Sequence, residues 1–218
     1  MYEDRRDAGR ILAHLVATLP NLNDGVVLAL PRGGVPVAFE VARRCRLPLD
    51  IFLVRKLGAP GQRELAMGAI ASGGTTVLNE DVLRSLRVPE RVLEAVTERE
   101  TRILQRMEAA YREGRAPIAI EGRTVILVDD GLATGATMRA AVRAVRPRAK
   151  AVIVAVPVGA KSTCADLRSE ADQVICAAMP EPLDAVGRFY RNFDPTSDEE
   201  VRMLLAEARA TSPRLPQA

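Results

Sequence analysis

Two adjacent carboxylates and the short loop of small residues after them form the most informative segment of this sequence. Asp129 and Asp130 follow an apolar run at residues 125–128, and residues 131–135 lead into a helical pattern. Adjacent carboxylates repel each other and therefore favour hydroxyl donors or a cation as partners. A ribose 2′,3′-diol supplies two such donors. The segment thus predicts a binding position for sugar hydroxyls at the end of a strand.

The loop after the acids is suited to a phosphate group. Small residues let backbone amides close on an anion, and the partial positive charge of a helix N-terminus favours phosphate. Thr134 and Thr137 add hydroxyl donors. The segment lacks the Gly-Lys-Ser/Thr ending of a Walker A loop, the GxGxxG of a dinucleotide fold and the alternating oxygen ligands of an EF-hand loop. Diol and phosphate positions side by side fit ribose 5-phosphate, whereas the alternative is a strand–turn–helix without a ligand.

The run VDDGLATGATM, which begins at Val128, resembles the signature that binds 5-phosphoribosyl-1-pyrophosphate (PRPP) in type I phosphoribosyltransferases. The resemblance implies transfer of ribose 5-phosphate to a nitrogenous base or related acceptor, with release of pyrophosphate. It also implies Mg²⁺ as a cofactor, held by Asp129 and Asp130 directly or through water. The expected contacts to the ribose and its phosphate are Asp129, Asp130, Ala133, Thr134, Gly135, Ala136 and Thr137.

Two further segments resemble the family's pyrophosphate contacts. The sequence LPRGG at residues 30–34 follows an apolar run, and its glycines allow close approach of the backbone to a ligand. The resemblance implies that Arg32 and Gly33 bind pyrophosphate and are joined by a cis peptide bond. Arg55 and Lys56 follow a second apolar run, and paired cations suit pyrophosphate oxygens. Without a ligand, these segments would be a plain β–α turn and a solvated basic turn.

Catalysis in this interpretation uses the acids, Lys56 and a mobile loop. Within residues 57–66, the stretch GAPG at residues 58–61 reads as a mobile loop, and it resembles the flexible loop that closes over the family's active site and excludes water. Asp129 and Asp130 would stabilise positive charge on the ribose ring, and Lys56 would bind the departing pyrophosphate. Glu64, in the expected loop, is the candidate acid or base.

The acceptor is the least defined part of the prediction. Phe189 and Tyr190 lie in a small aromatic cluster that resembles the family's hood, where an aromatic ring stacks on the acceptor base. Their alternative role is to anchor the last helix. At the position of Ala133, 6-oxopurine enzymes usually carry Asp, so hypoxanthine, guanine and xanthine are disfavoured and the loop is closer to the adenine and orotate types.

Short apolar runs that alternate with helical patterns predict a doubly wound α/β fold with a mainly parallel central sheet. One domain, residues 1–218, is expected, with a core at about 25–178, a helical addition at about 80–114 and a hood at about 180–210. The expected strands are 26–30, 51–54, 125–128, 152–156 and 174–177, and the helices between them are 35–46, 136–146 and 162–171. A β-hairpin at 67–72 and 75–78, a long helix at 89–114 and a last helix at 198–210 complete the prediction. The long helix either packs on the surface or forms a lid or a dimer contact.

Composition excludes several other classes. The net charge is only +3 and no basic run stands out, so a nucleic-acid partner is not expected. The first ten residues are too charged for a signal peptide, and no apolar run approaches the ~20 residues that span a membrane. Cys45, Cys164 and Cys176 show no metal-ligand spacing and fit a reducing, cytoplasmic location, while His14 is the sole histidine and fits a structural role.

Three functions remain open at this stage. The favoured one is an enzyme whose partners are PRPP, a small acceptor and, as in many relatives, a second copy in a homodimer. The first alternative is a non-catalytic protein of the same fold that senses PRPP or a nucleotide and regulates. The second is a phosphosugar hydrolase, which needs a water-activating group that the sequence does not offer. The favoured interpretation requires that the acids are not buried in internal salt bridges and that the phosphate loop is open.

Overall fold

A five-stranded parallel sheet forms the centre of the protein. The computed structural model describes residues 1–59 and 61–211, and the side chains of residues 62–64 are outside that description. The strand order is β2-β1-β6-β7-β8, and every pairing is parallel. The strands are β1 (Val26–Ala29), β2 (Leu49–Ile51), β6 (Thr124–Val128), β7 (Ala151–Val158) and β8 (Gln173–Ala178).

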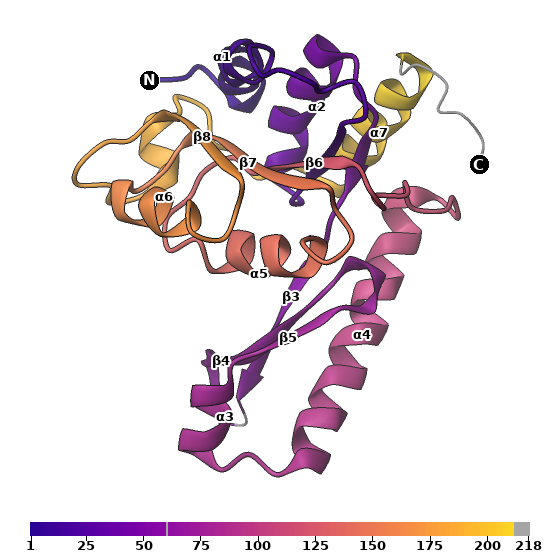
Figure 1. The fold of residues 1–218 in the computed structure, drawn as a ribbon, viewed down its shortest axis with the longest axis vertical. Coiled ribbons are helices and arrows are strands. Elements are labelled where there is room, and N and C mark those ends of the chain that lie inside the picture. The colour runs from indigo at the N-terminus through magenta and orange to yellow at the C-terminus, as the bar shows by residue number, and fades with distance from the viewer. Residues whose placement is uncertain (60, 212–218) are drawn as a thin grey trace.

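Helices cover both faces of this sheet, which confirms the doubly wound fold (Figure 1). On one face lie α1 (Arg5–Val16), α2 (Gly34–Cys45) and α7 (Asp198–Thr211), and on the other lie α5 (Ala136–Val145) and α6 (Lys161–Leu167). Every residue of β1 and β6 is buried. Alternate residues of β1 belong to two different hydrophobic clusters, one on each face, because successive side chains of a strand point in opposite directions. Unbroken apolar runs are therefore the correct signal for these strands.

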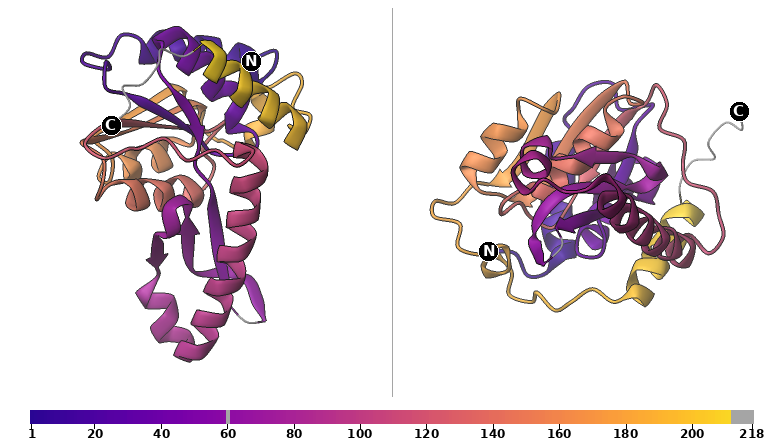
Figure 2. Two further views of the ribbon diagram at one scale, coloured as in Figure 1. Left: turned by 90° about the vertical axis from the view of Figure 1, so that its right-hand side faces the viewer. Right: turned by 90° about the horizontal axis from the view of Figure 1, so that it is seen from below.

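Residues 54–112 form a projection from the central sheet, which we call the arm (Figures 1 and 2). It contains a three-stranded antiparallel sheet in the order β3-β4-β5 and two helices. Its elements are β3 (Val54–Ala59), β4 (Gln62–Ala71), the 3-10 turn η1 (Ser72–Gly74), β5 (Thr76–Leu78), α3 (Glu80–Leu86) and α4 (Glu90–Arg112). The expected hairpin at 67–72 and 75–78 corresponds to β4 and β5, and the expected long helix corresponds to α4.

Two expectations for this region need correction. In the stretch at residues 58–61, expected as a mobile loop, Gly58 and Ala59 belong to β3, which pairs with β4 in antiparallel register, and residue 60 lies outside the described residues. The apolar run at residues 51–54 is not one strand, because the chain passes there from the central sheet into the arm. Phe52 N–H still donates to Ala29 O in the central sheet, whereas Leu53 N–H donates to Ser72 Oγ in the arm.

A buried ion pair fixes the base of the arm. Arg112, the last residue of α4, donates from Nε to both carboxylate oxygens of Asp50 in β2, at 3.0 and 3.2 Å. Its Nη2 donates to Ile51 O at 3.0 Å. Both side chains are buried. The end of α4 is therefore joined to the edge strand of the central sheet.

The segment before the last helix crosses the protein to reach the N-terminal residues. It contains a 3-10 turn, η2 (Val186–Phe189), and Tyr190 pairs with Tyr2 in an isolated bridge. Ser197 caps α7, because Glu200 N–H donates to its Oγ at 3.0 Å. Among the described residues, no helix combines the length and the apolar character that a membrane span requires.

Candidate active site

The two predicted acids lie directly against the glycine turn that follows β1. Asp129 and Asp130 follow β6, the neighbour of β1 in the sheet, so both segments end at the same sheet edge. A Cβ on Gly33 would lie 2.0 Å from Asp130 Oδ2, and one on Gly34 would lie 2.7 Å from Val128 O. Only glycine fits these two positions without a shift. The structure therefore brings together two segments that the sequence separates by about 100 residues.

The turn differs from the expectation in one bond. The non-proline cis peptide joins Pro31 and Arg32, one bond earlier than the expected Arg32–Gly33 position. The side chain of Arg32 is half exposed, and its Nη1 lies 3.5 Å from Oδ1 of Asp198 at the start of α7. Arg32 therefore stands at the edge of the site rather than within it.

Asp130 is engaged in an internal ion pair that the sequence did not indicate. Arg5 donates from Nε to Asp130 Oδ2 at 2.8 Å, and both side chains are largely buried. The same guanidinium donates to Asp194 O at 2.7 Å and lies 3.9 Å from the ring centre of Phe193. Arg5 belongs to an amphipathic helix 125 residues away in sequence, so no local pattern identifies it. One of the two conditions set for the acids, freedom from internal salt bridges, thus fails for Asp130.

Asp129 differs from its neighbour in its surroundings. Burial raises its pKa well above the ordinary value for an aspartate, and the charge of Asp130 raises it further. The Asp130 backbone N–H, which donates to Asp129 Oδ1 at 2.8 Å, and the charge of Arg5 act in the opposite direction. A carboxylate in this position gains from a hydroxyl donor or a cation.

The predicted phosphate loop is open, which satisfies the second condition. Ala133, Thr134, Ala136 and Thr137 are exposed at the start of α5. Gly135, with φ 71°, is the N-cap residue, and no side chain caps this helix end. The first-turn amides of α5 are therefore directed at the surface beside the acids.

A cleft of about 690 Å³ separates the arm from α5 and reaches the phosphate loop. Thr134 and Thr137 line it from the loop, and Lys56 lines it from β3. Arg139 and Arg143 of α5 also line it. Ligand pockets commonly measure about 300–1,000 Å³, so this cleft is large enough for a phosphorylated sugar with a second group. Lys56 and the phosphate loop, which the sequence placed in one site, do share one cleft.

Arg55 does not belong to that cleft, contrary to the prediction. Its Nε donates to Glu100 Oε2 of α4 at 2.7 Å, and its Nη1 lies 3.7 Å from Met107 Sδ. Burial alone would raise the pKa of Glu100, but its hydrogen bond and ion pair with Arg55 lower the pKa below the ordinary value. Adjacent residues of a strand point to opposite faces, so Arg55 faces α4 while Lys56 faces α5.

The aromatic cluster does not form an open hood. Tyr190 is buried, and its hydroxyl donates to the backbone oxygen of Asp130 at 2.6 Å. Its ring packs between Tyr2 and Phe193, so it is not free to stack on a base. Phe189 is half-buried and packs against the same cluster. The alternative role, an anchor for the C-terminal segment, is the one that the contacts of Tyr190 fit.

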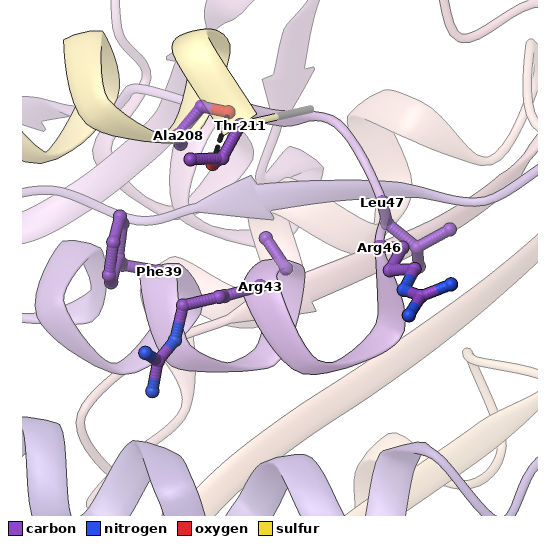
Figure 3. A pocket seen from close by; sticks show the side chains of 7 residues that line it. Phe39, Arg43, Arg46, Leu47, Ala208 and Thr211 are labelled. Carbon is purple, nitrogen blue, oxygen red and sulfur yellow. Dashed lines mark hydrogen bonds between the residues drawn. The ribbon is translucent and has the colours of Figure 1, made fainter. Parts of the chain in front are cut away.

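Three further features of the chain lie outside the site as described above. Glu64 is part of β4, and its side chain lies outside the described residues. In the described part of the chain, no three His, Cys, Asp or Glu side chains are grouped to hold a metal. A cavity of about 50 Å³ lies between α2 and α7 (Figure 3). The cavity lies toward the C-terminal end of α2, whereas the acids lie at the N-terminal end of that helix. Its lining residues are Phe39, Ala42, Arg43, Arg46, Leu47, Ala208 and Thr211.

Comparison with known proteins identifies the family of the chain. A family model described as a phosphoribosyl transferase domain matches residues 2–182. A Mycobacterium tuberculosis protein, provisionally named a phosphoribosyl transferase, is 47% identical over 209 residues, which are 95% of this chain and 47% of that protein. The chain thus spans about half the length of the two curated Mycobacterium tuberculosis relatives that it matches. The bifunctional protein PyrR of Roseiflexus sp. is 37% identical over 110 residues, 50% of this chain and 54% of that protein. The crystal structure of TT1426 from Thermus thermophilus has 43% identity and a TM-score of 0.84, over 94% of this chain and 98% of that one.

Proposed function

The chain belongs to the phosphoribosyl transferase domain family, and from that premise we propose that it binds PRPP and transfers ribose 5-phosphate to a small acceptor, releasing pyrophosphate. One observation carries the proposal: the acid pair lies against the glycine turn at residues 31–34 and beside an exposed, uncapped phosphate loop.

Different residues bind the different parts of PRPP. The 5-phosphate binds to the first-turn amides of α5 with the hydroxyls of Thr134 and Thr137. The ribose hydroxyls donate to Asp129, which lacks the ion pair that Asp130 makes with Arg5. Pyrophosphate binds at the Arg32–Gly33 turn and to Lys56 from the cleft. Asp130 contacts the ribose only when the sugar hydroxyl replaces Arg5 as the partner of its carboxylate.

The acid pair is also the proposed position for Mg²⁺. Magnesium in such sites is usually bound by one or two carboxylates together with substrate phosphates. Two adjacent carboxylates match this donor set, and a bound cation would offset the burial and the repulsion from Asp130 that raise the pKa of Asp129. When bound, the ion would neutralise charge on the leaving pyrophosphate. The protein's own part is to orient the ribose through Asp129 and to retain pyrophosphate through Lys56.

A second candidate, a sensor that binds PRPP or a nucleotide without catalysis, is favoured by a specific observation. Arg5 already neutralises Asp130, and Arg55 is committed to Glu100 rather than to the cleft. Both contacts remove groups that a transferase would use. The two candidates share a binding site and differ in turnover.

Two measurements test these proposals. Calorimetry with PRPP and Mg²⁺ should show binding to the native chain and none to the Asp129→Asn, Asp130→Asn double variant. As a control, Arg102→Met alters an exposed ion pair on α4 and should leave binding unchanged. Equal affinity in the native chain and the double variant would refute the assigned site.

A screen of purine, pyrimidine and pyridine-acid acceptors, read as pyrophosphate release, separates the two candidates. Release with one acceptor class supports the transferase. Binding of PRPP without release across the screen supports the sensor.

A further inference from the structure

Two cysteines that are 12 residues apart in sequence meet behind the phosphate loop. Cys164 lies in the first turn of α6 and is fully buried, and Cys176 lies in β8 and is partly exposed. A Cβ placed on Gly159 would lie 2.8 Å from Cys164 Sγ and 3.2 Å from Cys176 Sγ. The two sulfur atoms are therefore no further apart than the sum of these distances. Glycine at residue 159 leaves the space that both thiols use.

The Cys176 thiol donates to the backbone oxygen of Ala178 at 3.1 Å, and the pKa values of the two thiols depend on each other. A hydrogen bond with Cys176 lowers the pKa of Cys164 to about 7, although burial acts in the opposite direction. The same hydrogen bond, together with burial, raises the pKa of Cys176. A thiolate next to a thiol is the arrangement from which a disulfide forms, because the thiolate is the reactive species.

The residue next to Cys164 contacts the phosphate loop directly. Thr163, the residue before Cys164, donates from Oγ1 to Ala133 O at 2.7 Å. Its Cγ2 lies 2.4 Å from the position that a Cβ on Gly135 would take. On the other side, Leu132 pairs with Gly159 in an isolated bridge. The loop that would bind phosphate thus rests on the same turn of α6 that carries Cys164.

We propose that Cys164 and Cys176 form a reversible disulfide bond whose closure moves the phosphate loop and lowers the affinity for PRPP. A disulfide brings two sulfur atoms to about 2.0 Å, inside the contact distance of two thiols. Closure therefore draws the first turn of α6 toward β8 and displaces Thr163 from Ala133. The disulfide between Cys164 and Cys176 is independent of the proposed function, whereas its effect on PRPP affinity rests on the proposed function.

A peroxide is the oxidant class that fits this site, because it is small and uncharged and can reach the buried Cys164 past the partly exposed Cys176. The thiolate attacks one peroxide oxygen to give a sulfenic acid, and the leaving oxygen departs as water after taking up a proton. The second sulfur then displaces the sulfenic oxygen as a second water molecule. Two thiols and one hydrogen peroxide thus give one disulfide and two waters, and a dithiol reductant reverses the change.

The first experiment treats the full chain carrying Cys45→Ala, which removes the third thiol, with hydrogen peroxide. Peptide mass mapping without reductant should show residues 164 and 176 linked, with the loss of two hydrogen atoms and reversal by a dithiol. The same chain with Cys176→Ala should give no link. Two free thiols, or a singly oxidised cysteine without the link, would overturn the proposal.

The second experiment compares the linked and reduced forms of the same Cys45→Ala chain, so that no core variant is needed. Hydrogen exchange should become faster at residues 131–137 in the linked form, and the dissociation constant for PRPP should rise by about 5- to 150-fold, the usual range for coupled sites. Unchanged exchange and affinity would overturn the coupling. If neither form binds PRPP, the proposed function fails, while the mapped link and the exchange rates still decide the disulfide.

Discussion

Replacing Arg112 by Met should destabilise the protein strongly, because it leaves a carboxylate buried without its cation. The guanidinium donates to Asp50 at 3.0 and 3.2 Å, to Ile51 O at 3.0 Å and to Glu108 Oε1 at 2.9 Å. Met has a similar length and no charge, so packing changes little. After the substitution, Asp50 keeps the backbone N–H of Ile118, at 3.0 Å, as a donor.

The size of the effect follows from burial. Both side chains are less than one tenth exposed, at 7% for Arg112 and 5% for Asp50. Breaking a buried ion pair by removing one partner costs about 3–5 kcal/mol. For a chain of this size, that loss lowers the melting temperature by on the order of 10 °C. Arg102→Met is the matched control, because its ion pair with Glu98 is exposed and contributes about 0.5 kcal/mol or less.

Urea unfolding of four proteins measures the pair: native, Arg112→Met, Asp50→Asn and the double variant. We expect the double variant to be more stable than Arg112→Met, because it no longer buries an unpaired charge. A cost for Arg112→Met within about 0.5 kcal/mol of the Arg102→Met control would refute the reasoning. It would mean that Asp50 is solvated or neutral and that the arm is held by other contacts.

Three further predictions concern the site. Asp129→Asn should raise the free energy of unfolding at pH 7 by about 1.4 kcal/mol for each pKa unit of the shift. The pKa of Asp129 is raised in the folded protein, so its ionised carboxylate lowers the free energy of unfolding. This loss is absent below the unfolded pKa and complete above the folded pKa. A stability gain in urea unfolding that persists unchanged at pH 3 would contradict this. Gly33→Ala should abolish PRPP binding in calorimetry, since its Cβ would lie 2.0 Å from Asp130 Oδ2; retained affinity would show that the turn relaxes freely. Lys56→Ala should weaken pyrophosphate binding about tenfold or more, by loss of one charge-assisted contact, whereas Arg55→Ala should not; equal effects would mean that both cations reach the cleft.

The central sheet could be predicted from the sequence because its signal is local. The runs at residues 125–128 and 152–156 are apolar without interruption, and both faces of those strands are covered. The acid pair and phosphate loop were predictable for the same reason, since strand, acids, loop and helix are contiguous. Their meeting with the turn at residues 31–34 followed from the rule that parallel strands end at one edge.

The errors come from contacts between distant segments. Gly58 and Gly61 give residues 57–66 the composition of a loop, but pairing with β4 extends the strand through the first of them. Arg5 pairs with Asp130, which is 125 residues away in sequence, and no local sequence pattern around Arg5 indicates this ion pair. Arg55 is different, because strand alternation alone shows that it and Lys56 cannot both face one cleft. Tyr190 was placed in the hood by resemblance, with an anchor as the alternative, because a cluster of aromatic residues in sequence does not distinguish a buried anchor from an exposed stacking ring.

The two ends of the arm lie side by side. The chain leaves the central sheet after Ile51 and returns after Arg112, and Arg112 donates to Ile51 O at 3.0 Å. A segment whose entry and exit coincide behaves as a removable cassette, because its deletion leaves a gap that a short linker can close. The five-stranded sheet, with its acids and phosphate loop, could thus be produced without residues 54–111, or with the equivalent segment of a relative grafted in their place, provided that Arg112 is kept as the partner of the buried Asp50. Such chimaeras would separate what the sheet recognises from what the cassette adds.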